Sequence, residues 1–340
     1  MTRTEWLKFV YDNDVFDAYQ YIDNTKKTLD IVCYCKELIK KLLSKMENDN
    51  NRCRTDIFER FLGHSGPIKS ATLNVKDFPT YSTTICGIEV NAVFLLEKLI
   101  KDFYQYVRNA FDCMSQTANA SILGTKAEEI EKVDFNHMKK IFKENKEYIK
   151  MFPNISSWYS KIGESKEYKY INAFNNRTKH ICDVNLKFSM SIIGNGDVSE
   201  INPFFKNKQR YDKKDIMDCI EWVFDFVSKV YSEFMTVLRI EVTKKIFVKN
   251  RFHNIVKTLR TSDADIAIII DDKSFHDKPE MIELLPVDNM NGIMEGHNST
   301  FEMVYICAPN QEDSYISYKV VNDVCQDDFL LKYRRYRRFK

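Results

Sequence analysis

Apolar residues recur at helical spacing over long stretches of the first 260 residues, and this periodicity constrains the fold more than any other feature. The clearest stretch runs from Thr28 to Met46, where apolar side chains follow one another at intervals of three and four residues. Such spacing places them on one face of an amphipathic helix. Similar patterns predict further helices at about residues 86–122, 165–193 and 212–259.

Turn-forming residues are scarce, which also favours long helices. The 340 residues include only 9 Gly and 7 Pro, whereas a sandwich or doubly wound sheet needs a turn residue about every ten positions. The helix predicted at 212–259 is long for a globular protein. We predict Asp212 as its N-cap and allow one break near Thr243.

The pattern changes near residue 261. Short β-branched or aromatic runs predict strands at Ile266–Ile270, Met281–Val287, Phe301–Ala308 and Tyr315–Val321. Charge changes at the same place: residues 261–331 carry a net −12, residues 332–340 carry +6, and residues 1–260 carry +8. We therefore predict a mainly α protein with a helical domain (1–260) and a small acidic domain (261–340), α+β or β, that ends in a basic tail.

Several functional classes lack sequence support. The nine cysteines are scattered without a Cys-x-x-Cys pair, and we interpret them as reduced thiols of a cytoplasmic protein. No uncharged run reaches about 18 residues, so we expect no membrane span. Glycine-rich phosphate loops, hydrolase elbows and kinase signatures do not occur. We predict no metal or cofactor, and interpret Asp263, Asp265, Asp271 and Asp272 as strand ends and the three tryptophans as packing residues.

The most informative stretch is Tyr170–His180, in the third predicted helix. On a helix extended to residue 193, Phe174, Ile181, Val184, Phe188 and Ile192 form an apolar face. Arg177 projects near the middle of that face, with His180 at its edge. Asn176 precedes His180 by four residues and can orient the imidazole.

These residue types suit cleavage of RNA without a metal. An imidazole exchanges protons near neutral pH, and an arginine can hold the scissile phosphate. RNA supplies its own nucleophile, the 2′-hydroxyl. A symmetric dimer would bring two such pairs into one composite site. The alternative is structural: Arg177 pairs with a helix carboxylate and His180 is a satisfied packing residue.

The sequence Asn172-x-x-Asn175-Asn176-Arg177-Thr178-Lys179-His180, preceded by a long helix containing Phe111–Asn119, resembles the HEPN superfamily. It is similar to bacterial members of the abortive-infection and mobile-element type, over roughly residues 20–258. The resemblance implies a dimeric helical bundle, with RNA as substrate and metal-independent endoribonuclease activity in active members. It assigns His180, Arg177 and Asn176 to catalysis. Asp112 and Gln116 of the preceding helix could support the site; alternatively, they belong to a solvated face.

The match departs from the usual HEPN spacing, because the nearest arginine precedes His180 by only three residues. Either Arg177 acts from one turn away, or this chain binds RNA or a protein partner without cutting. The first hypothesis is therefore a ribonuclease effector of antiphage defence or a toxin–antitoxin system, and the second a non-catalytic dimeric binding module.

The basic tail, Lys332–Lys340, interleaves cations with aromatic residues. Its arginines could contact RNA phosphates, as could Lys179. Alternatively, the tail docks on the acidic segment 261–331, where a regulatory protein partner could displace it, or it is a solvated end. The arginines concerned are Arg334, Arg335, Arg337 and Arg338.

Overall fold

The computed structural model is mainly helical. It describes residues 18–62, 75–181, 183–192 and 196–247, with shorter pieces at 5–6, 9–10, 13, 15, 255–259, 267–270, 280–284, 303–307, 316–324 and 333–339. The chain divides into two compact units. The first, called the bundle unit, comprises Asn24–Ser115 and Asp134–Val237; the second, called the strand unit, comprises Met1–Asp23, Gln116–Val133 and Leu238–Lys340.

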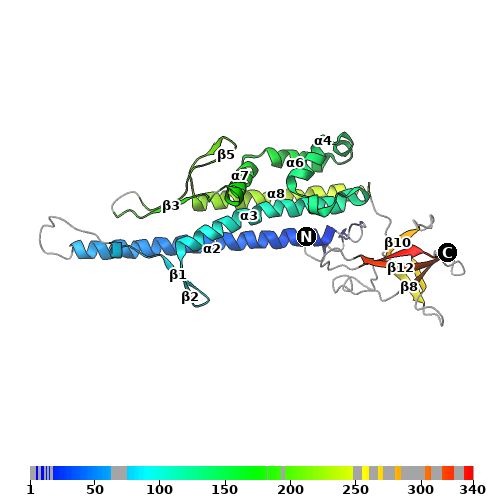
Figure 1. The fold of residues 1–340 in the computed structure, drawn as a ribbon, viewed down its shortest axis with the longest axis horizontal. Coiled ribbons are helices and arrows are strands. Elements are labelled where there is room, and N and C mark those ends of the chain that lie inside the picture. The colour runs from blue at the N-terminus through cyan, green and yellow to red at the C-terminus, as the bar shows by residue number, and fades with distance from the viewer. Residues whose placement is uncertain are drawn as a thin grey trace. The chain divides into compact units, whose positions relative to one another are not determined.

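Three long helices, α2, α3 and α8, lie side by side, and α4, α6 and α7 pack on one side of them (Figure 1). The helices are α2 (Ala18–Leu62), α3 (Ala92–Ala118), α4 (Phe135–Glu144), α5 (Lys146–Met151), α6 (Pro153–Glu164), α7 (Lys166–His180) and α8 (Ile216–Val242). Direct contacts between the long helices include Thr28–Cys113, Lys36–Phe224 and Tyr104–Cys219. The prediction of a helical bundle is therefore confirmed.

Aromatic side chains fill the interior of the bundle unit. Tyr104 of α3 stacks on Phe174 of α7 with ring centroids 3.9 Å apart. Phe135 of α4 lies 4.5 Å from Tyr168 of α7 by the same measure. All four residues are less than 4% exposed. Such rings bury large apolar areas, so they fix α4 and α7 firmly on α3.

The predicted helix at 86–122 begins later than expected, because a β-hairpin precedes it. Strands β1 (Ser82–Ile85) and β2 (Ile88–Asn91) pair antiparallel around Cys86 and Gly87. Both turn residues have positive φ, +49° and +81°, as a two-residue hairpin turn requires. The amide oxygen of Asn91 then caps α3 by accepting the backbone N–H groups of Val93 and Phe94.

The third helix also ends earlier than predicted, at His180 instead of residue 193. Strand β3 (Leu186–Ser189) follows and pairs with β4 (Val198–Ile201), which pairs with β7 (Lys214–Asp215). Apolar residues from Val184 to Ile192 occupy every second position. Val184, Phe188 and Ile192 are therefore also four residues apart, which is a helical spacing, and the strand was mistaken for a continuation of the helix.

Helix α8 begins and ends inside the predicted range of 212–259. The prediction of Asp212 as the N-cap was wrong, because this residue forms an ion pair with Arg210 at 3.1 Å. The capping residue is Asp215, whose carboxylate accepts the backbone N–H groups of Met217 and Asp218 at 2.8 and 3.0 Å. The helix ends at Val242, next to the break that was placed near Thr243.

The strand unit contains a six-stranded sheet with the order β10-β13-β12-β11-β9-β8. Its strands are β8 (Ile255–Leu259), β9 (Ala267–Ile270), β10 (Met281–Leu284), β11 (Met303–Cys307), β12 (Ile316–Val324) and β13 (Tyr333–Arg338). All neighbours are antiparallel except β9 and β11. The four predicted strands correspond to β9–β12. Strand β8 was not predicted and precedes residue 261. The domain boundary near residue 261 stays a prediction.

A glycine fixes the backbone near the end of α3. After a π-helical turn at Asn119–Leu123, Gly124 adopts a φ of +46°. The next amide, of Thr125, donates to the carbonyl of Phe247 at 3.1 Å. A Cβ at position 124 would lie 1.7 Å from that carbonyl oxygen, so only glycine permits this approach.

Candidate functional site

Helix α7, which carries the predicted site residues, has well-defined ends. Ser165 is its N-cap, with its hydroxyl accepting the backbone N–H of Tyr168 at 3.2 Å. Arg177, Lys179 and His180 lie in its last turn. Cations are favourable there because the last carbonyl groups give a helix C-terminus a partial negative charge.

The apolar face expected around Arg177 does not form, because α7 ends at His180 and the residues from Val184 onward lead into strand β3. Arg177 is half-buried and its Nη1 donates to the backbone carbonyl of Phe205 at 3.0 Å. Its Nε is buried and has no acceptor among the described residues. The guanidinium therefore has a structural contact on the neighbouring hairpin.

The other two predicted catalytic residues lie close to Arg177 on the same helix. His180 and its neighbour Lys179 are exposed. Asn176 is half-buried and donates its amide to Asn172 Oδ1 at 3.2 Å. The assignment of these residues to catalysis stays a prediction.

Asp112, predicted as possible site support, makes two contacts that hold the bundle together. Its Oδ1 accepts the backbone N–H of Phe135 at 2.9 Å, at the start of α4. It also forms an ion pair with Arg108 of its own helix, a residue that is only 7% exposed. Gln116 is half-buried. Asp112 therefore has a structural role, and whether it or Gln116 supports a site stays a prediction.

Two contacts hold a basic hairpin along α7. Strands β5 (Phe204–Lys206) and β6 (Gln209–Tyr211) pair antiparallel. Arg177, in the last turn of α7, donates to the Phe205 carbonyl, and the Tyr211 hydroxyl donates to the carbonyl of Lys169, earlier in the helix, at 3.4 Å. The hairpin presents Lys206, Lys208 and Arg210, of which the last two are exposed, together with a Phe205 ring that is 53% exposed. The hairpin thus adds cations and an open aromatic ring to the predicted residues of α7.

Helical geometry places several polar residues of α7 on one side. Asn176 and His180 follow Lys169 by seven and eleven positions. At about 100° per residue, each lies within about 20° of Lys169 around the helix axis, and the two lie about 40° from each other. The separation of Lys169 from His180 along the axis is about 16 Å. These three residues therefore form a polar track on one side of α7.

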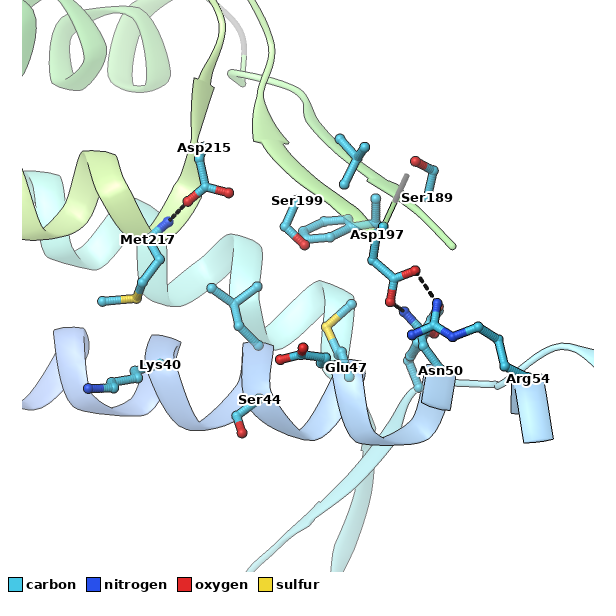
Figure 2. A pocket seen from close by; sticks show the side chains of 16 residues that line it. Lys40, Ser44, Glu47, Asn50, Arg54, Ser189, Asp197, Ser199, Asp215 and Met217 are labelled. Atoms are coloured by element: carbon cyan, nitrogen blue, oxygen red, sulfur yellow. Dashed lines mark hydrogen bonds and ion pairs between the residues drawn. The ribbon is translucent and has the colours of Figure 1, made fainter. Parts of the chain in front are cut away.

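A polar pocket of about 430 Å³ lies between α2 and the β3–β4 segment (Figure 2). At one end, Asp197 Oδ1 accepts Arg54 Nη1 at 2.6 Å, and Oδ2 accepts the amide of Asn50 at 2.7 Å. Tyr81 donates to the same amide of Asn50 at 2.5 Å. These polar groups satisfy one another, so the network fastens β4 to α2.

The network also determines the protonation of Asp197. Burial raises the pKa of this carboxyl group, but the hydrogen bonds from Arg54, Asn50 and the backbone N–H of Ser191 outweigh burial, and the net pKa is lowered. Figure 2 shows Asp197 pointing towards Asn50 and Arg54, away from Lys40 and Asp215 at the other end of the pocket.

A second pocket, of about 380 Å³, lies at the other end of α7 from His180. Trp222 of α8 and Tyr211 line it together with three lysines, Lys166, Lys169 and Lys214. The sequence predicted Trp222 as a packing residue, yet it is half-buried, whereas Trp6 and Trp158 are buried. The available signal for this pocket was the closeness in sequence of Lys166, Lys169 and Tyr170.

The basic tail forms strand β13, between β10 and β12. Of the predicted RNA-binding arginines, Arg334 pairs in register with Leu284 and Asp323, and Arg335 with Glu283 and Asn322. The tail is therefore docked on strands of the acidic segment. The side chains of Arg337 and Arg338 are exposed, and their contact with RNA stays a prediction.

The described part of the chain contains no cluster of three or more His, Cys, Asp or Glu side chains suitable for a metal ion. Asp263, Asp265, Asp271 and Asp272 lie outside the described residues. Within those residues, no helix combines the length and apolar character needed to cross a bilayer.

The comparisons with known proteins concern the C-terminal part of the chain. Residues 248–339 match a domain of unknown function, DUF8310. This range begins before β8 and ends just after β13, so it covers the six-stranded sheet. No curated protein and no solved structure shows significant similarity to the chain. The HEPN resemblance of residues 20–258 stays a prediction.

Proposed function

We propose that this chain acts on RNA and binds it as a single strand along α7 and the β5–β6 hairpin. The observation that carries the proposal is the pair of contacts, Arg177–Phe205 and Tyr211–Lys169, that hold the hairpin along the helix. Arg177 contacts the hairpin strand that carries Lys206, and it is followed within three residues by the exposed Lys179 and His180.

The chemistry of this surface favours a nucleic acid that exposes its bases. Lysine and arginine neutralise backbone phosphates, and an exposed ring such as Phe205 can stack on an unpaired base. Lys208 has a φ of +65° at the hairpin turn and forms no ion pair with the described residues. Its charge is therefore available to a phosphate.

Cleavage is one form of this proposal. His180 would act as general acid and base, Arg177 would bind the scissile phosphate, and a homodimer would bring two such pairs together. The exposed imidazole, one helical turn from Arg177, favours this form. As a ribonuclease, the protein would act as an effector in antiphage defence or in a toxin–antitoxin system.

Binding without cleavage is the second form, and the contacts of Arg177 favour it. A guanidinium that already donates to the Phe205 carbonyl has fewer N–H groups for a phosphate. In this form Arg177 positions the hairpin, and the cations around it bind the strand.

The test measures binding of a fluorescein-labelled single-stranded RNA decamer by anisotropy over a range of salt concentrations. Lys208→Glu should weaken binding and reduce the salt slope by about one or more. Lys229→Glu is the matched control, since Lys229 is an exposed lysine of α8 away from the hairpin. Equal affinities for the two variants would contradict the proposed surface.

A second assay separates the two forms. Wild type and His180→Ala are incubated with the same RNA in EDTA, and the fold of both is checked by circular dichroism. Cleavage that disappears in the folded variant supports the ribonuclease. RNA that is bound by both proteins and cut by neither supports the binding module.

A further inference from the structure

The pocket at the start of α7 has walls of aromatic rings. Tyr170 makes edge contacts with both Trp222 and Tyr211, each at 5.6 Å between ring centroids, with interplanar angles of 69° and 77°. Phe204 stacks on Tyr211 at 4.9 Å and holds that ring in place. The pocket is therefore a preformed slot with rings at a steep angle to one another.

A cation lies against these rings. Lys214 Nζ is 4.3 Å from the ring centroid of Trp222 and 5.7 Å from that of Tyr170. These cation–π contacts hold the ammonium group at the pocket, whereas a lysine on an open surface samples many rotamers. Tyr170 itself is buried, and burial raises the pKa of its hydroxyl group, which stays protonated.

The remaining charges of the pocket leave a surplus of positive charge. Glu164 accepts Lys169 at 3.3 Å and lies 3.7 Å from Lys143, so its charge is matched by neighbouring lysines. Lys166 and Lys214 form no ion pair with the described residues. A small pocket with aromatic walls and two unpaired ammonium groups suits a ligand that combines a flat ring with an anionic group.

We propose that this pocket is a subsite for one nucleotide of the bound RNA strand, with the base against Trp222 and Tyr211 and a phosphate on Lys166 and Lys214. The inference rests on the proposed function and names where one base of the strand is held. Stacking on aromatic side chains is tolerant of sequence because every base has a π-face, so the subsite accepts any base.

The position of the pocket connects it with the rest of the RNA surface. Lys169 lines the pocket and also begins the polar track that ends at His180, about 16 Å away along the helix axis. Tyr211 lines the pocket and belongs to the hairpin that carries Lys208. A single strand following α7 would therefore place one base in the pocket and later phosphates beside the hairpin.

The experiment uses full-length protein labelled with 5-fluorotryptophan. The chain has three tryptophans, so the ¹⁹F spectrum has three signals, and Trp222→Phe identifies that of Trp222. We expect adenosine 5′-monophosphate and the RNA decamer to shift the Trp222 signal and leave those of the buried Trp6 and Trp158 in place. Adenosine, which lacks the phosphate, should bind at least about fivefold more weakly, as expected for one lost charged contact.

Affinity for the decamer provides a second measurement that does not depend on replacing a packed ring. Lys166→Ala and Lys214→Ala should each weaken binding at low salt and reduce the salt slope by about one. Lys229→Ala, on the far part of α8, should leave both unchanged. Trp222→Ala should weaken binding at least about fivefold if it retains its fold by circular dichroism.

The outcomes distinguish this inference from the function on which it rests. If the decamer binds through the hairpin but the Trp222 signal stays in place and the Lys166 and Lys214 variants bind normally, the subsite is refuted and the RNA surface stands. If adenosine and its monophosphate bind equally well, the phosphate contacts are refuted. If wild type binds no RNA, the proposed function fails. A Trp222 shift by the mononucleotide alone would then replace the RNA subsite with a site for free nucleotides.

Discussion

Replacing Asp112 with alanine tests whether this carboxylate holds the bundle together. Its Oδ1 accepts the Phe135 N–H and pairs with Arg108, which is buried. Breaking a buried ion pair by removing one partner costs about 3–5 kcal/mol, and an unsatisfied backbone N–H costs about 1–3 kcal/mol. The Asp112 side chain is 28% exposed, so water replaces part of both contacts. We therefore expect the free energy of unfolding to fall by about 3 kcal/mol.

The assay combines urea unfolding with hydrogen exchange measured by mass spectrometry. The peptide that contains Phe135 should lose protection in Asp112→Ala, because its amide loses the acceptor. The matched control is Asp102→Ala, since Asp102 pairs with Lys98 at the same spacing on the same helix but at the surface. An exposed pair of this kind contributes only about 0–1 kcal/mol.

A double variant isolates the cost of the unpaired charge. Arg108→Met combined with Asp112→Ala removes both charges and should recover part of the stability lost in Asp112→Ala alone. The reasoning is refuted if Asp112→Ala and Asp102→Ala lie within about 0.5 kcal/mol of each other. Unchanged protection of Phe135 in Asp112→Ala would refute the hydrogen bond.

Three further predictions concern other parts of the structure. Because the folded pKa of Asp197 is lowered below its unfolded value of about 3.9, its charged carboxylate stabilises the fold above that pH, and the contribution is lost as pH falls through the folded pKa; Asp197→Asn should flatten the pH dependence of the urea midpoint below about pH 4. Gly124→Ala should lower the melting temperature, since the new Cβ meets the Phe247 carbonyl and positive φ alone costs about 1 kcal/mol or more. Asp215→Ala should cost about 1 kcal/mol of unfolding free energy as a lost N-cap, whereas Asp212→Ala, which removes only an exposed pair, should change it by less than about 0.5 kcal/mol.

The sequence predicted the long helices well because their apolar faces are continuous. Thr28–Met46 lies inside α2, and the break near Thr243 coincides with the end of α8. The prediction failed where one set of apolar residues fits both the helical and the strand spacing. Val184, Phe188 and Ile192 fit both a helix and a strand, and only the pairing of β3 with β4 decides between them.

The candidate site shows a similar division. The sequence placed Asn176, Arg177 and His180 on one helix, and they do lie there. It could not show that Arg177 binds a hairpin carbonyl or that Asp112 reaches the start of α4. Both contacts are made to backbone atoms of residues more than 20 positions away, and a backbone atom leaves no signature in the side-chain pattern.

The place of β13 in the sheet has a consequence for the order in which the chain can assemble. Strand β10 pairs with β13, from which it is separated by about 50 residues that include β11 and β12. During synthesis, β8, β9, β11 and β12 can meet while β10 still has no neighbour in the sheet. Strand β10 can therefore join the sheet only after the arginine-rich residues 333–338 have been synthesised. A nascent chain stopped at residue 332 would expose the unpaired edge of β12 to other chains.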